Sequence, residues 1–547
     1  EKFTVFKHNP NDDNSLLSNS IYDIKQMKDG KIWICTNMGG VSILDLQHNA
    51  FISAEEIDFQ NIKATNDNYG LSSPNARCAY QDCYGNIWIG NYRGGIDFIS
   101  HTQPMFNILP YTIETAKGLS YKQVWGMWAT DNQVWLGSED ELGLFINGKK
   151  IKTYDLYSHE LVYNTHINTI YEDRQKRLWL GTYKNGILLY KPDKQEIVHI
   201  SSSLFNNLDV RCFYEDQNGK MWIGTETGIY SCTNEVLVKE EEIQKQLPDI
   251  MVHSLLRDKE GKLWVGTFGK GISIFDVNNK LLWNFVIENG FCSNAVNHMI
   301  KDSEEQIWVA TREGLAVFKN TSQPNRYKIF KEKEGLENSH IRAICEDLEK
   351  RIWISSNDGI SCLDPKQNLF YNYNHHDGVP MGDFMNGSTC MTHNGIIYFG
   401  SQNGACFFNP KELSSIRQVS PVKITQFCKY NKKTESKDAE ISIPFKKGVV
   451  HLPYNQNSFR ITFNVLDYTQ SPQVEFTYML EGLENRWYDT QGENQVIFRN
   501  IPPGKYNFKV RTRIRNQEWD KEIASLNIFI APPLWLTWYA KLGYVIL

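Results

Sequence analysis

The sequence lacks an excess of basic residues, a regular spacing of cysteines and, almost throughout, the periodicity of helices. Its 58 Lys and Arg residues are outnumbered by 63 Asp and Glu residues, which gives a formal net charge of −5. Nucleic acids are bound through basic surfaces, so this balance argues against a nucleic-acid partner for this segment. The lack of helical periodicity favours a fold built from β-strands.

The 11 cysteines are scattered, with no Cys-x-x-Cys pair and no pair of histidines beside them. This distribution indicates neither a zinc site nor a disulfide framework. Most of the cysteines fall inside strand patterns, where free thiols commonly act as small buried apolar residues; examples are Cys212, Cys345, Cys362 and Cys406. We therefore expect no metal ion and no cofactor.

Two polar segments have some features of metal sites. The adjacent histidines of "NHHDG" (374–378) point to opposite sides of an extended chain, which favours a polar linker over a metal site. The stretch "NPNDDNS" (9–15) has the composition of a calcium loop but lacks its Asp-x-Asp-x-Asp-Gly spacing. Both are predicted to be connecting loops.

The dominant feature of the sequence is a repeat. The stretch "RLWLGTYKNGILLY" (177–190) recurs in related form, with aromatic anchors mostly 42 to 47 residues apart: Trp33, Trp88, Trp135, Trp179, Trp222, Trp264, Trp308, Trp353 and Tyr398. Each copy contains four short alternating segments, and its first turn often has the form Asp-x-x-Gly, which suits a tight hairpin. Four antiparallel strands at this period predict a β-propeller blade whose tryptophan fills the wedge between neighbouring blades.

Nine copies are too many for one ring, because propellers usually close with about four to eight blades. We place the seam after the second copy, which leaves seven copies from Trp135 to Tyr398. The last of these lacks an obvious fourth strand, and Phe106–Thr112 is predicted to supply it and so close the ring. The first two copies are then the last two blades of an incomplete N-terminal propeller, although an internal deletion would give the same pattern.

From Pro421 the period disappears, and about seven alternating segments within roughly 110 residues predict an immunoglobulin-like sandwich. Its predicted core anchors are Phe463, Tyr478, Leu480, Trp487, Phe498, Tyr506 and Val510. The predicted fold class is therefore all-β, with one or more seven-bladed β-propellers followed by an immunoglobulin-like β-sandwich.

The chain is predicted to divide into the incomplete propeller at 1–104, the seven-bladed propeller at 105–418, the sandwich at 419–531 and the start of a truncated transmembrane helix at 532–547. The last segment has Trp535, Trp538 and Tyr539 where a membrane helix meets the headgroups. It is too short to span a bilayer, which needs about 20 residues. A terminal core strand or helix is the alternative.

The ordered combination of motifs resembles a known family. Repeats of the type "D..G.LWIGT..GGI", followed by "EFTYMLEGLENRW", "NIPPGKYNFKVR" and "IAPPLWLTWYAKL", are similar to the periplasmic sensor region of hybrid two-component system histidine kinases of the Bacteroidetes, with two-component regulator propeller repeats and a Y_Y_Y domain. The resemblance covers essentially the whole chain. It implies the periplasmic region of an inner-membrane protein, which binds an oligosaccharide and controls glycan-utilisation genes through a kinase domain outside this chain.

The same resemblance implies that this segment itself has no catalytic activity and is joined to the membrane through its C-terminal helix. We expect a homodimer, in which the bound oligosaccharide changes the relative orientation of the two sandwiches and so moves the membrane helices. A ligand shifts such an equilibrium only by its differential affinity for the two arrangements.

Candidate ligand-binding residues follow from an alignment of the repeats. If strand direction alternates, the linkers between blades and the turns after the second strands lie on one face of the disc. Sugars are bound by planar hydrogen-bonding groups and aromatic faces, and Arg also pairs with uronate or sulfate. A first ring, at the starts of the innermost strands, offers Trp125, Asn168, Arg211, His253 and Arg342, together with Asn297 and Gly387; a second ring, in the turns, offers Tyr183, Phe268 and Arg312. The alternative for each is a loop-capping or channel-solvating role.

Two other classes of function remain open. Propellers also host glycosidases and lyases, but the Ser-x-Asp-x-Gly-x-x-Trp box of sialidases is absent. A retaining glycosidase needs two carboxyl groups about 5 Å apart, and the sequence does not place Glu139 beside Glu226. A protein-binding scaffold is the third class. A sensor should bind a glycan without cleaving it, an enzyme should cleave it, and a scaffold should not respond.

Overall fold

The computed structural model describes residues 5–45, 59–64, 70–101, 105–109, 112–113, 120–121, 123–139, 141–146, 148–156, 166–200, 208–413, 421–429, 439–441, 449–466, 474–490, 492–514, 519–536 and 539. The chain divides into two compact units. One is Met105–Ile416, and the other consists of Glu1–Pro104 and Arg417–Leu547.

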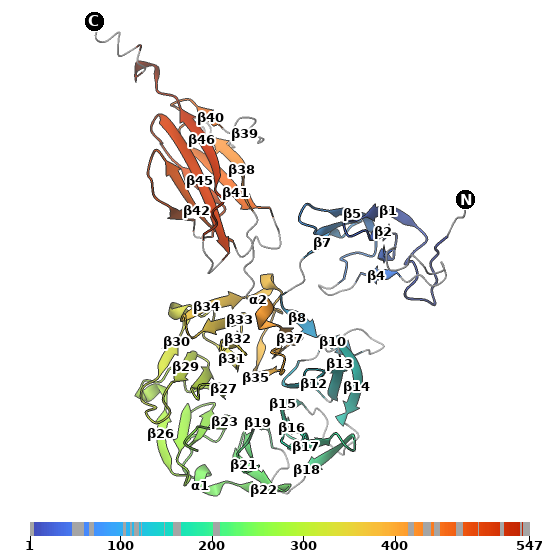
Figure 1. Cartoon of the computed structure of the whole chain (residues 1–547), viewed down its shortest axis with the longest axis vertical. Coiled ribbons are helices and arrows are strands. Elements are labelled where there is room, and N and C mark those ends of the chain that lie inside the picture. Colours follow the sequence, from blue (N-terminus) through green and yellow to red (C-terminus); the bar gives the residue numbers. More distant parts are fainter. Residues whose placement is uncertain are drawn as a thin grey trace. The chain divides into compact units, whose positions relative to one another are not determined.

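The unit Met105–Ile416 contains seven four-stranded antiparallel sheets arranged as a ring (Figure 1). Each innermost strand contacts the innermost strand of the next sheet, and β35 (Phe384–Met391) contacts β11 (Gly126–Ala129). The ring is therefore closed, and the predicted propeller fold is confirmed.

Each blade runs from an innermost strand at the axis to an outermost strand at the rim. In that order, the first three are β11, β12 (Gln133–Gly137), β13 (Glu141–Ile146) and β14 (Lys149–Asp155); β15 (Ile167–Glu172), β16 (Leu178–Thr182), β17 (Ile187–Lys191) and β18 (Glu196–Ile200); and β19 (Val210–Glu215), β20 (Met221–Thr225), β21 (Gly228–Thr233) and β22 (Val236–Lys239). The fourth and fifth are β23 (Val252–Arg257), β24 (Leu263–Thr267), β25 (Ile272–Phe275) and β26 (Leu281–Phe285); and β27 (Val296–Lys301), β28 (Ile307–Thr311), β29 (Gly314–Phe318) and β30 (Lys328–Phe330).

The sixth blade is β31 (Ile341–Glu346), β32 (Ile352–Ser356), β33 (Ile360–Asp364) and β34 (Leu369–Tyr373), and the seventh is β35, β36 (Ile397–Ser401), β37 (Gly404–Phe408) and β8 (Asn107–Leu109). Short elements connect the blades: α1 (Glu241–Gln244), η2 (Ile287–Asn289), η3 (Glu332–Glu334), η4 (His375–Asp377) and the pair β9 (Thr112–Ile113) with β10 (Ser120–Tyr121). The short helix α2 (Pro410–Leu413) follows the seventh blade.

The seventh blade takes its outer strand from the N-terminal end of the unit. Ile108 of β8 pairs with Cys406 of β37 in antiparallel register. Phe106, which is 1% exposed, packs against the rings of Tyr373 and Phe408 at centroid distances of 5.2 and 4.8 Å. The prediction that this segment supplies the missing fourth strand is confirmed for Asn107–Leu109.

The anchor tryptophans of the seven-bladed propeller are buried between blades. Trp264 is 0% exposed and lies 5.1 Å from the ring of Phe318 in the next blade. Its Nε1–H donates to Oδ2 of Asp258 at 3.0 Å, while Oδ1 of Asp258 accepts bonds from two backbone N–H groups of the Asp-x-x-Gly turn. The same pair occurs as Asp173–Trp179, Asp216–Trp222, Asp302–Trp308 and Asp347–Trp353. These carboxylates are therefore structural.

The second turn of the motif, between the second and third strands of a blade, is also determined by contacts close by in the sequence. Oγ1 of Thr267 donates to the carbonyl oxygen of Gly271 at 3.1 Å and closes the turn. Gly271 has a φ of +63°, and a Cβ atom there would lie 1.9 Å from the carbonyl oxygen of Phe285. Only glycine fits at this position, because it has no Cβ.

The segment 1–104 forms two packed sheets. The first is β1 (Ile21–Gln26), β2 (Ile32–Thr36), β3 (Gly40–Leu44) and β4 (Gln60–Ile62), and the second is β5 (Ala76–Gln81), β6 (Ile87–Asn91) and β7 (Gly95–Ile99). They share a buried cluster that includes Trp33, Ile43 and Ile89. The two sheets repeat the strand order of the propeller blades.

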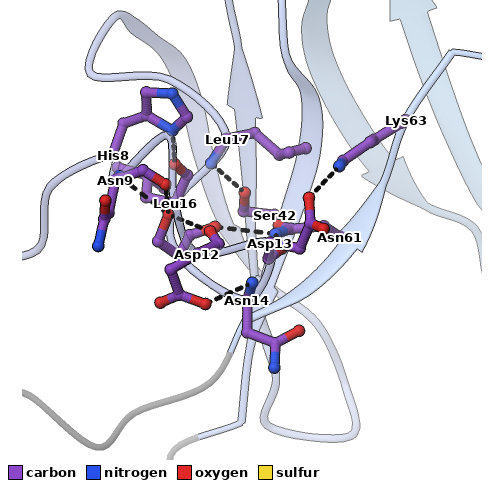
Figure 2. A network of polar contacts seen from close by, with 11 residues as sticks. His8, Asn9, Asp12, Asp13, Asn14, Leu16, Leu17, Ser42, Asn61 and Lys63 are labelled. Atoms are coloured by element: carbon purple, nitrogen blue, oxygen red, sulfur yellow. Dashed lines mark hydrogen bonds and ion pairs between the residues drawn. The ribbon is translucent and has the colours of Figure 1, made fainter.

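The loop 9–15 is held by its own polar groups, as Figure 2 shows. Oγ of Ser15 donates to the carbonyl oxygens of Asn9 and Asp12, and Oδ1 of Asp12 accepts the N–H of Asn14. Asp13 pairs with Lys63 of the sheet at 2.8 Å. The side-chain oxygens of this segment thus shape a connecting loop, as predicted.

The described part of the C-terminal segment is a β-sandwich. One sheet has the order β39 (Ala439–Ile441), β38 (Val422–Lys429), β41 (Phe459–Val465) and β44 (Gln495–Phe498). The other has the order β40 (Val449–Leu452), β46 (Ala524–Ile530), β45 (Gly504–Ile514), β42 (Val474–Glu481) and β43 (Tyr488–Asp489). The sequence predicted about seven strands, and the short β39 and β43 account for the excess.

Most of the predicted sandwich anchors lie in the core. Phe463, Leu480, Phe498, Tyr506 and Val510 are buried, and Tyr478 packs against them half-buried. The Oη of Tyr506 donates to the carbonyl oxygen of Pro502 at 2.7 Å, which ties the "PPGKY" turn to its strand. The prediction was wrong for Trp487, which lies outside the core and stacks on the guanidinium of Arg511 at 4.2 Å.

The predicted membrane-helix start at 532–547 lies largely outside the described residues. Leu534–Leu536 forms a single 3-10 turn, η6. Within the described part of the chain, no helix is both long and apolar enough to cross a membrane.

Candidate ligand-binding site

β-Bulges set the position of the first ring. In five successive blades the register of the innermost strand shifts across its second residue, which is left as the extra residue: Asn168, Arg211, His253, Asn297 and Arg342. A bulge bends its strand and changes the direction of the extra side chain. Each of these blades therefore contributes one residue whose backbone lies outside the regular hydrogen-bond ladder of the sheet.

A repeated backbone hydrogen bond joins the second ring to the first. The N–H of Tyr183 donates to the carbonyl oxygen of His166 at 2.8 Å, two residues before Asn168. Equivalent bonds run from Phe268 to Met251 and from Arg312 to Ala295. The turns and the strand starts consequently lie on one face, as the alternating strand directions predicted.

First-ring residues surround a cavity of about 120 Å³ on the propeller axis, which we call the axial cavity. Six of the seven blades contribute to its lining, which consists of Trp125, Asn168, Thr169, Arg211, Cys212, His253, Ser254, Leu255, Asn297, His298, Met299, Asn386 and Gly387. The structure therefore brings together six of the seven first-ring positions: Trp125, Asn168, Arg211, His253, Asn297 and Gly387.

The seventh blade closes one side of the axial cavity with an enlarged bulge, residues 385–388. The register passes from Phe384 opposite Ser401 to Thr389 opposite Phe399, so these four residues lie opposite a single residue of β36. β35 also contacts β27, although the sixth blade lies between them in the chain. A Cβ atom on Gly387 would lie 3.6 Å from Cδ2 of His298. The enlarged bulge thus reaches across the axis.

A buried carboxylate organises one side of the axial cavity. Asp209, which is 1% exposed, accepts a hydrogen bond from Nδ2 of Asn168 at 2.6 Å and forms an ion pair with Arg211. Burial raises the pKa of Asp209 to about 6, against the opposing effect of the Arg211 charge and with a further rise from Glu226. The contacts fix the orientation of two predicted site residues, Asn168 and Arg211.

An aromatic and cationic stack links the two rings. The ring of His253 lies 5.1 Å from that of Phe268, and the guanidinium of Arg312 lies 4.5 Å from the same Phe268 ring. Burial lowers the pKa of His253 to about 4, and the charges of Arg211 and Arg312 lower it further. His253 is therefore neutral near pH 7 and can both donate and accept a hydrogen bond.

The remaining predicted residues lie beside the axial cavity. Arg342 does not line it; its guanidinium donates to Asn357, to Asn386 of the enlarged bulge and to Asp383, at 2.7, 3.1 and 3.2 Å. Arg342 therefore supports the wall instead of facing the space. Tyr183 lies in the second ring, with its ring 5.8 Å from that of His166.

One buried acceptor in the lining has no partner among the described residues. Asn297 is 2% exposed, and its Nδ2 donates to the carbonyl oxygen of Ile341 at 2.6 Å, which leaves Oδ1 without a hydrogen bond. An unpaired buried acceptor costs free energy, so this oxygen favours a donor such as a hydroxyl group inside the cavity.

Alignment on the tryptophans missed several residues of the site, among them Asp209, His298 and Asn386. The only signal for Asp209 in the sequence was its position two residues before Arg211. The residue at this position supplies the carbonyl oxygen that accepts the N–H of the turn. The enlarged bulge had a clearer signal, because Gly378 and Tyr398 are 20 residues apart whereas Gly335 and Trp353 are 18 apart. His298 follows Asn297 and had no signal of its own.

The lining suits binding more than hydrolysis. It offers one indole, two imidazoles, one guanidinium and three amides, which are the groups that bind sugar hydroxyls and sugar faces. A retaining glycosidase needs two carboxyl groups about 5 Å apart over its pocket. The described lining contains no Asp or Glu side chain.

The described residues contain no group of three or more His, Cys, Asp or Glu side chains placed to hold a metal ion. The segment 374–378 contains the 3-10 turn η4 (His375–Asp377), and Oδ2 of Asp377 accepts the N–H of Asn374 at 2.9 Å. Of the cysteines predicted as thiols in strands, Cys362 and Cys406 are buried, Cys212 and Cys345 are half-buried, and all four are free.

Two family models match parts of the chain. The Y_Y_Y domain model matches residues 467–531, and the two component regulator propeller model matches residues 162–184, 203–227 and 246–269. The first match falls on the sandwich and the others fall on successive blades.

Two known proteins are similar over most of the chain. The crystal structure of the extracellular domain of the hybrid two component system BT3049 from B. thetaiotaomicron has 40% sequence identity and a TM-score of 0.82, over 94% of this chain and 68% of that one. A curated protein of Formosa agariphila, "Histidine kinase P4", is 25% identical over 454 residues, 71% of this chain and 33% of that protein. The chain spans about a third of the length of this curated relative.

Proposed function

This chain belongs to the family of extracellular domains of hybrid two-component systems, and from that premise we propose that it binds an oligosaccharide in the axial cavity and transmits this signal across the membrane. The chain corresponds to the extracytoplasmic sensor part of such a system and not to its kinase. The identity of the ligand as a sugar, the control of glycan-utilisation genes and the inner membrane as the location are parts of the proposal.

The axial cavity is the observation that carries this proposal. Side chains from six blades meet there, and they include Trp125, Arg211 and His253. The unpaired Oδ1 of Asn297 adds an acceptor suited to a hydroxyl donor. Such a set of planar polar groups around one indole matches the mixed polar and apolar surface of a sugar ring.

The size of the cavity limits how much of a ligand can enter it. A volume of about 120 Å³ holds roughly four water molecules at about 30 Å³ each. One edge or substituent of a terminal sugar therefore enters the cavity, while the following sugars lie over the second ring, against Tyr183, Phe268 and Arg312. The turn positions of that ring then determine which glycan is accepted.

Transmission is proposed to use a homodimer joined to the membrane through the segment after the sandwich. A ligand that favours one arrangement of the two sandwiches shifts their equilibrium by its differential affinity, and a few kcal/mol suffice. Cysteine crosslinking between the sandwiches of full-length protein in membranes tests this step. The crosslinked fraction should change when the glycan is added, and an unchanged fraction at saturating glycan would exclude the mechanism.

Binding itself is tested by calorimetry of the purified chain against a panel of oligosaccharides, with product analysis of each mixture. We expect one glycan class to bind without being cleaved. Trp125→Ala should weaken that binding by about ten-fold or more, because the indole supplies the flat apolar contact. Trp283→Ala, on the outer strand β26, is the matched control and should leave the affinity unchanged. Cleavage of the glycan, or equal affinity in the two variants, would contradict the proposal.

A further inference from the structure

The N-terminal sheets carry a second cluster of cationic and aromatic side chains, at positions equivalent to the two rings of the propeller. The registers of β1 and β5 shift across Tyr22 and Arg77, which are left as the extra residues of two bulges. Tyr92 occupies the turn after β6, and its N–H donates to the carbonyl oxygen of Asn75 at 2.9 Å. The repeat therefore gathers Tyr22, Arg77 and Tyr92 on one face of these sheets.

Arg77 is held between two tyrosine rings. Its guanidinium carbon lies 3.8 Å from the ring centroid of Tyr22 and 4.8 Å from that of Tyr92. The guanidinium of Arg93 lies 5.2 Å from the Tyr92 ring. Tyr22 is 40% exposed and Tyr92 47% exposed. The stacked rings orient the guanidinium of Arg77, while its N–H groups remain open to an external partner.

This cluster carries the positive charges of two arginines, Arg77 and Arg93. Within the described part of 1–104, the guanidinium groups of Arg77 and Arg93 make no hydrogen bond and no ion pair with the protein. Asp23 accepts backbone N–H groups of β1 and β5, at 3.0 and 3.2 Å. Asp97 accepts a backbone N–H and an amide of two neighbours, at 3.0 and 2.7 Å. Asp23 and Asp97 therefore accept hydrogen bonds from other groups, and among the described residues of 1–104 neither guanidinium has a carboxylate partner.

We propose that this cluster, Tyr22, Arg77, Tyr92 and Arg93, is a binding site for an acidic saccharide. The planar fork of Arg77 pairs with a carboxylate or sulfate group through two parallel hydrogen bonds. The exposed tyrosine faces pack against the sugar ring that carries the acidic group. The site is distinct from the axial cavity, and its existence does not depend on a ligand binding there.

The test uses sugars that differ only in charge. Tetragalacturonate, its carboxyl-reduced counterpart galactotetraose, and sulfated galactotetraose are titrated into the full chain by calorimetry. The two charged sugars should bind more tightly than the neutral one. Arg77→Gln should weaken both charged sugars by about ten-fold or more and leave the neutral sugar unchanged. Arg326→Gln, an exposed arginine on the propeller, is the matched control and should change nothing.

Two further measurements distinguish binding at this cluster from binding at the axial cavity and from simple attraction between charges. Tyr22→Leu keeps the charge but removes one ring, and should weaken both charged sugars. Hydrogen exchange should show protection of β5 and of the turn at Tyr92 by tetragalacturonate, in wild type and in Trp125→Ala alike. The proposal fails if neither charged sugar binds, if Arg77→Gln binds them within about two-fold of wild type, or if inorganic sulfate displaces them at equal concentration.

Discussion

A buried indole needs an acceptor for its N–H, because an unpaired donor in a protein interior costs about 1–3 kcal/mol. In five blades of this propeller the acceptor is the aspartate six residues earlier, as in Asp258 and Trp264. The same carboxylate accepts the backbone N–H groups of the hairpin turn. One residue thus joins the wedge between blades to the turn within a blade, which explains why Asp-x-x-Gly and Trp recur together.

Replacement of this aspartate should destabilise the propeller. Asp258→Ala leaves the Trp264 N–H and two turn N–H groups without their acceptor, so we expect the free energy of unfolding to fall by about 2–4 kcal/mol. Urea denaturation followed by tryptophan fluorescence measures it. Asp193→Ala, in an exposed turn of the second blade, is the control and should change the stability by less than about 0.5 kcal/mol. A similar loss in both variants would show that the buried pair is not the cause.

Two buried histidines should make the protein less stable in mild acid. Burial lowers the pKa of His298 to about 4, and burial and two arginines do the same for His253. Their neutral forms are favoured by folding, so this stability is present above about pH 6.5, the unfolded pKa, and is lost as the pH falls toward 4. Asp209, with its pKa raised to about 6, acts in the opposite direction over the same range. The combined destabilising effect of the two histidines is larger than the stabilising effect of the single carboxyl group.

The measurement compares unfolding free energies at pH 7 and pH 5. Wild type should lose roughly 1–2 kcal/mol more than His298→Asn, in which the amide oxygen replaces Nδ1 as the acceptor for the Ile344 N–H. The exposed His393→Asn should behave as wild type. Identical pH dependence in wild type and His298→Asn would show that His298 titrates normally.

The innermost strand is the element that creates the site. Its bulge removes one residue per blade from the ladder, so that residue is free of the packing that determines its neighbours in the strand. This arrangement allows Asn168, Arg211 and His253 to differ while the blades stay alike. The enlarged bulge of β35 is the exception, and it turns an axial channel into a cavity with a wall formed by Asn386 and Gly387.

The enlarged bulge offers a test of the axial cavity that does not disturb the core. Gly387 has a φ of +67°, which Asn tolerates better than other side chains, and the nearest atom to an added Cβ lies at 3.6 Å. Gly387→Asn should therefore fold normally and fill the space, with glycan affinity lowered by about ten-fold or more. Gly219→Asn, with a φ of +78° in a hairpin turn and its nearest atom at 3.9 Å, is the control. Wild-type affinity in Gly387→Asn would place the ligand elsewhere.

The closure of the ring is a property of the whole propeller, because its last blade borrows β8 from the other end of the unit. Phe106 anchors this strand against the sixth and seventh blades. We propose that 1–104, 105–418, 419–531 and 532–547 are the divisions of the chain, with β8 as the start of the propeller. Because β8 is held by residues that are distant in the sequence, we expect it to unfold together with the rest of the ring.

Phe106→Ala tests this closure. Removal of a fully buried ring should lower the free energy of unfolding by about 3–5 kcal/mol and increase hydrogen exchange in β37, the partner of β8. Calorimetric melting and exchange measured by mass spectrometry give the two values. Val236→Ala, at a 63% exposed position on the outer strand β22, is the control for loss of an aliphatic side chain. Unchanged exchange in β37 would mean that β8 does not hold the seventh blade.

The sequence by itself determined the four-stranded blade, the number of blades in the ring and the strand that closes the ring. The Trp period, the alternation within strands and the turn residues are local signals, and each copy repeats them. The positions of the two rings followed for the same reason, because a constant offset from each tryptophan fixes a constant place in the blade.

Only the tertiary structure decided what those positions do. Asp209 orients Asn168 of the neighbouring blade, Arg342 supports the wall instead of facing the cavity, and the enlarged bulge crosses the axis. All three arrangements depend on contacts between different blades. Trp487 looked like a core anchor, and its stacking on Arg511 was equally invisible in sequence. Local patterns specify the repeating unit, whereas side-chain orientation and burial arise when distant units pack.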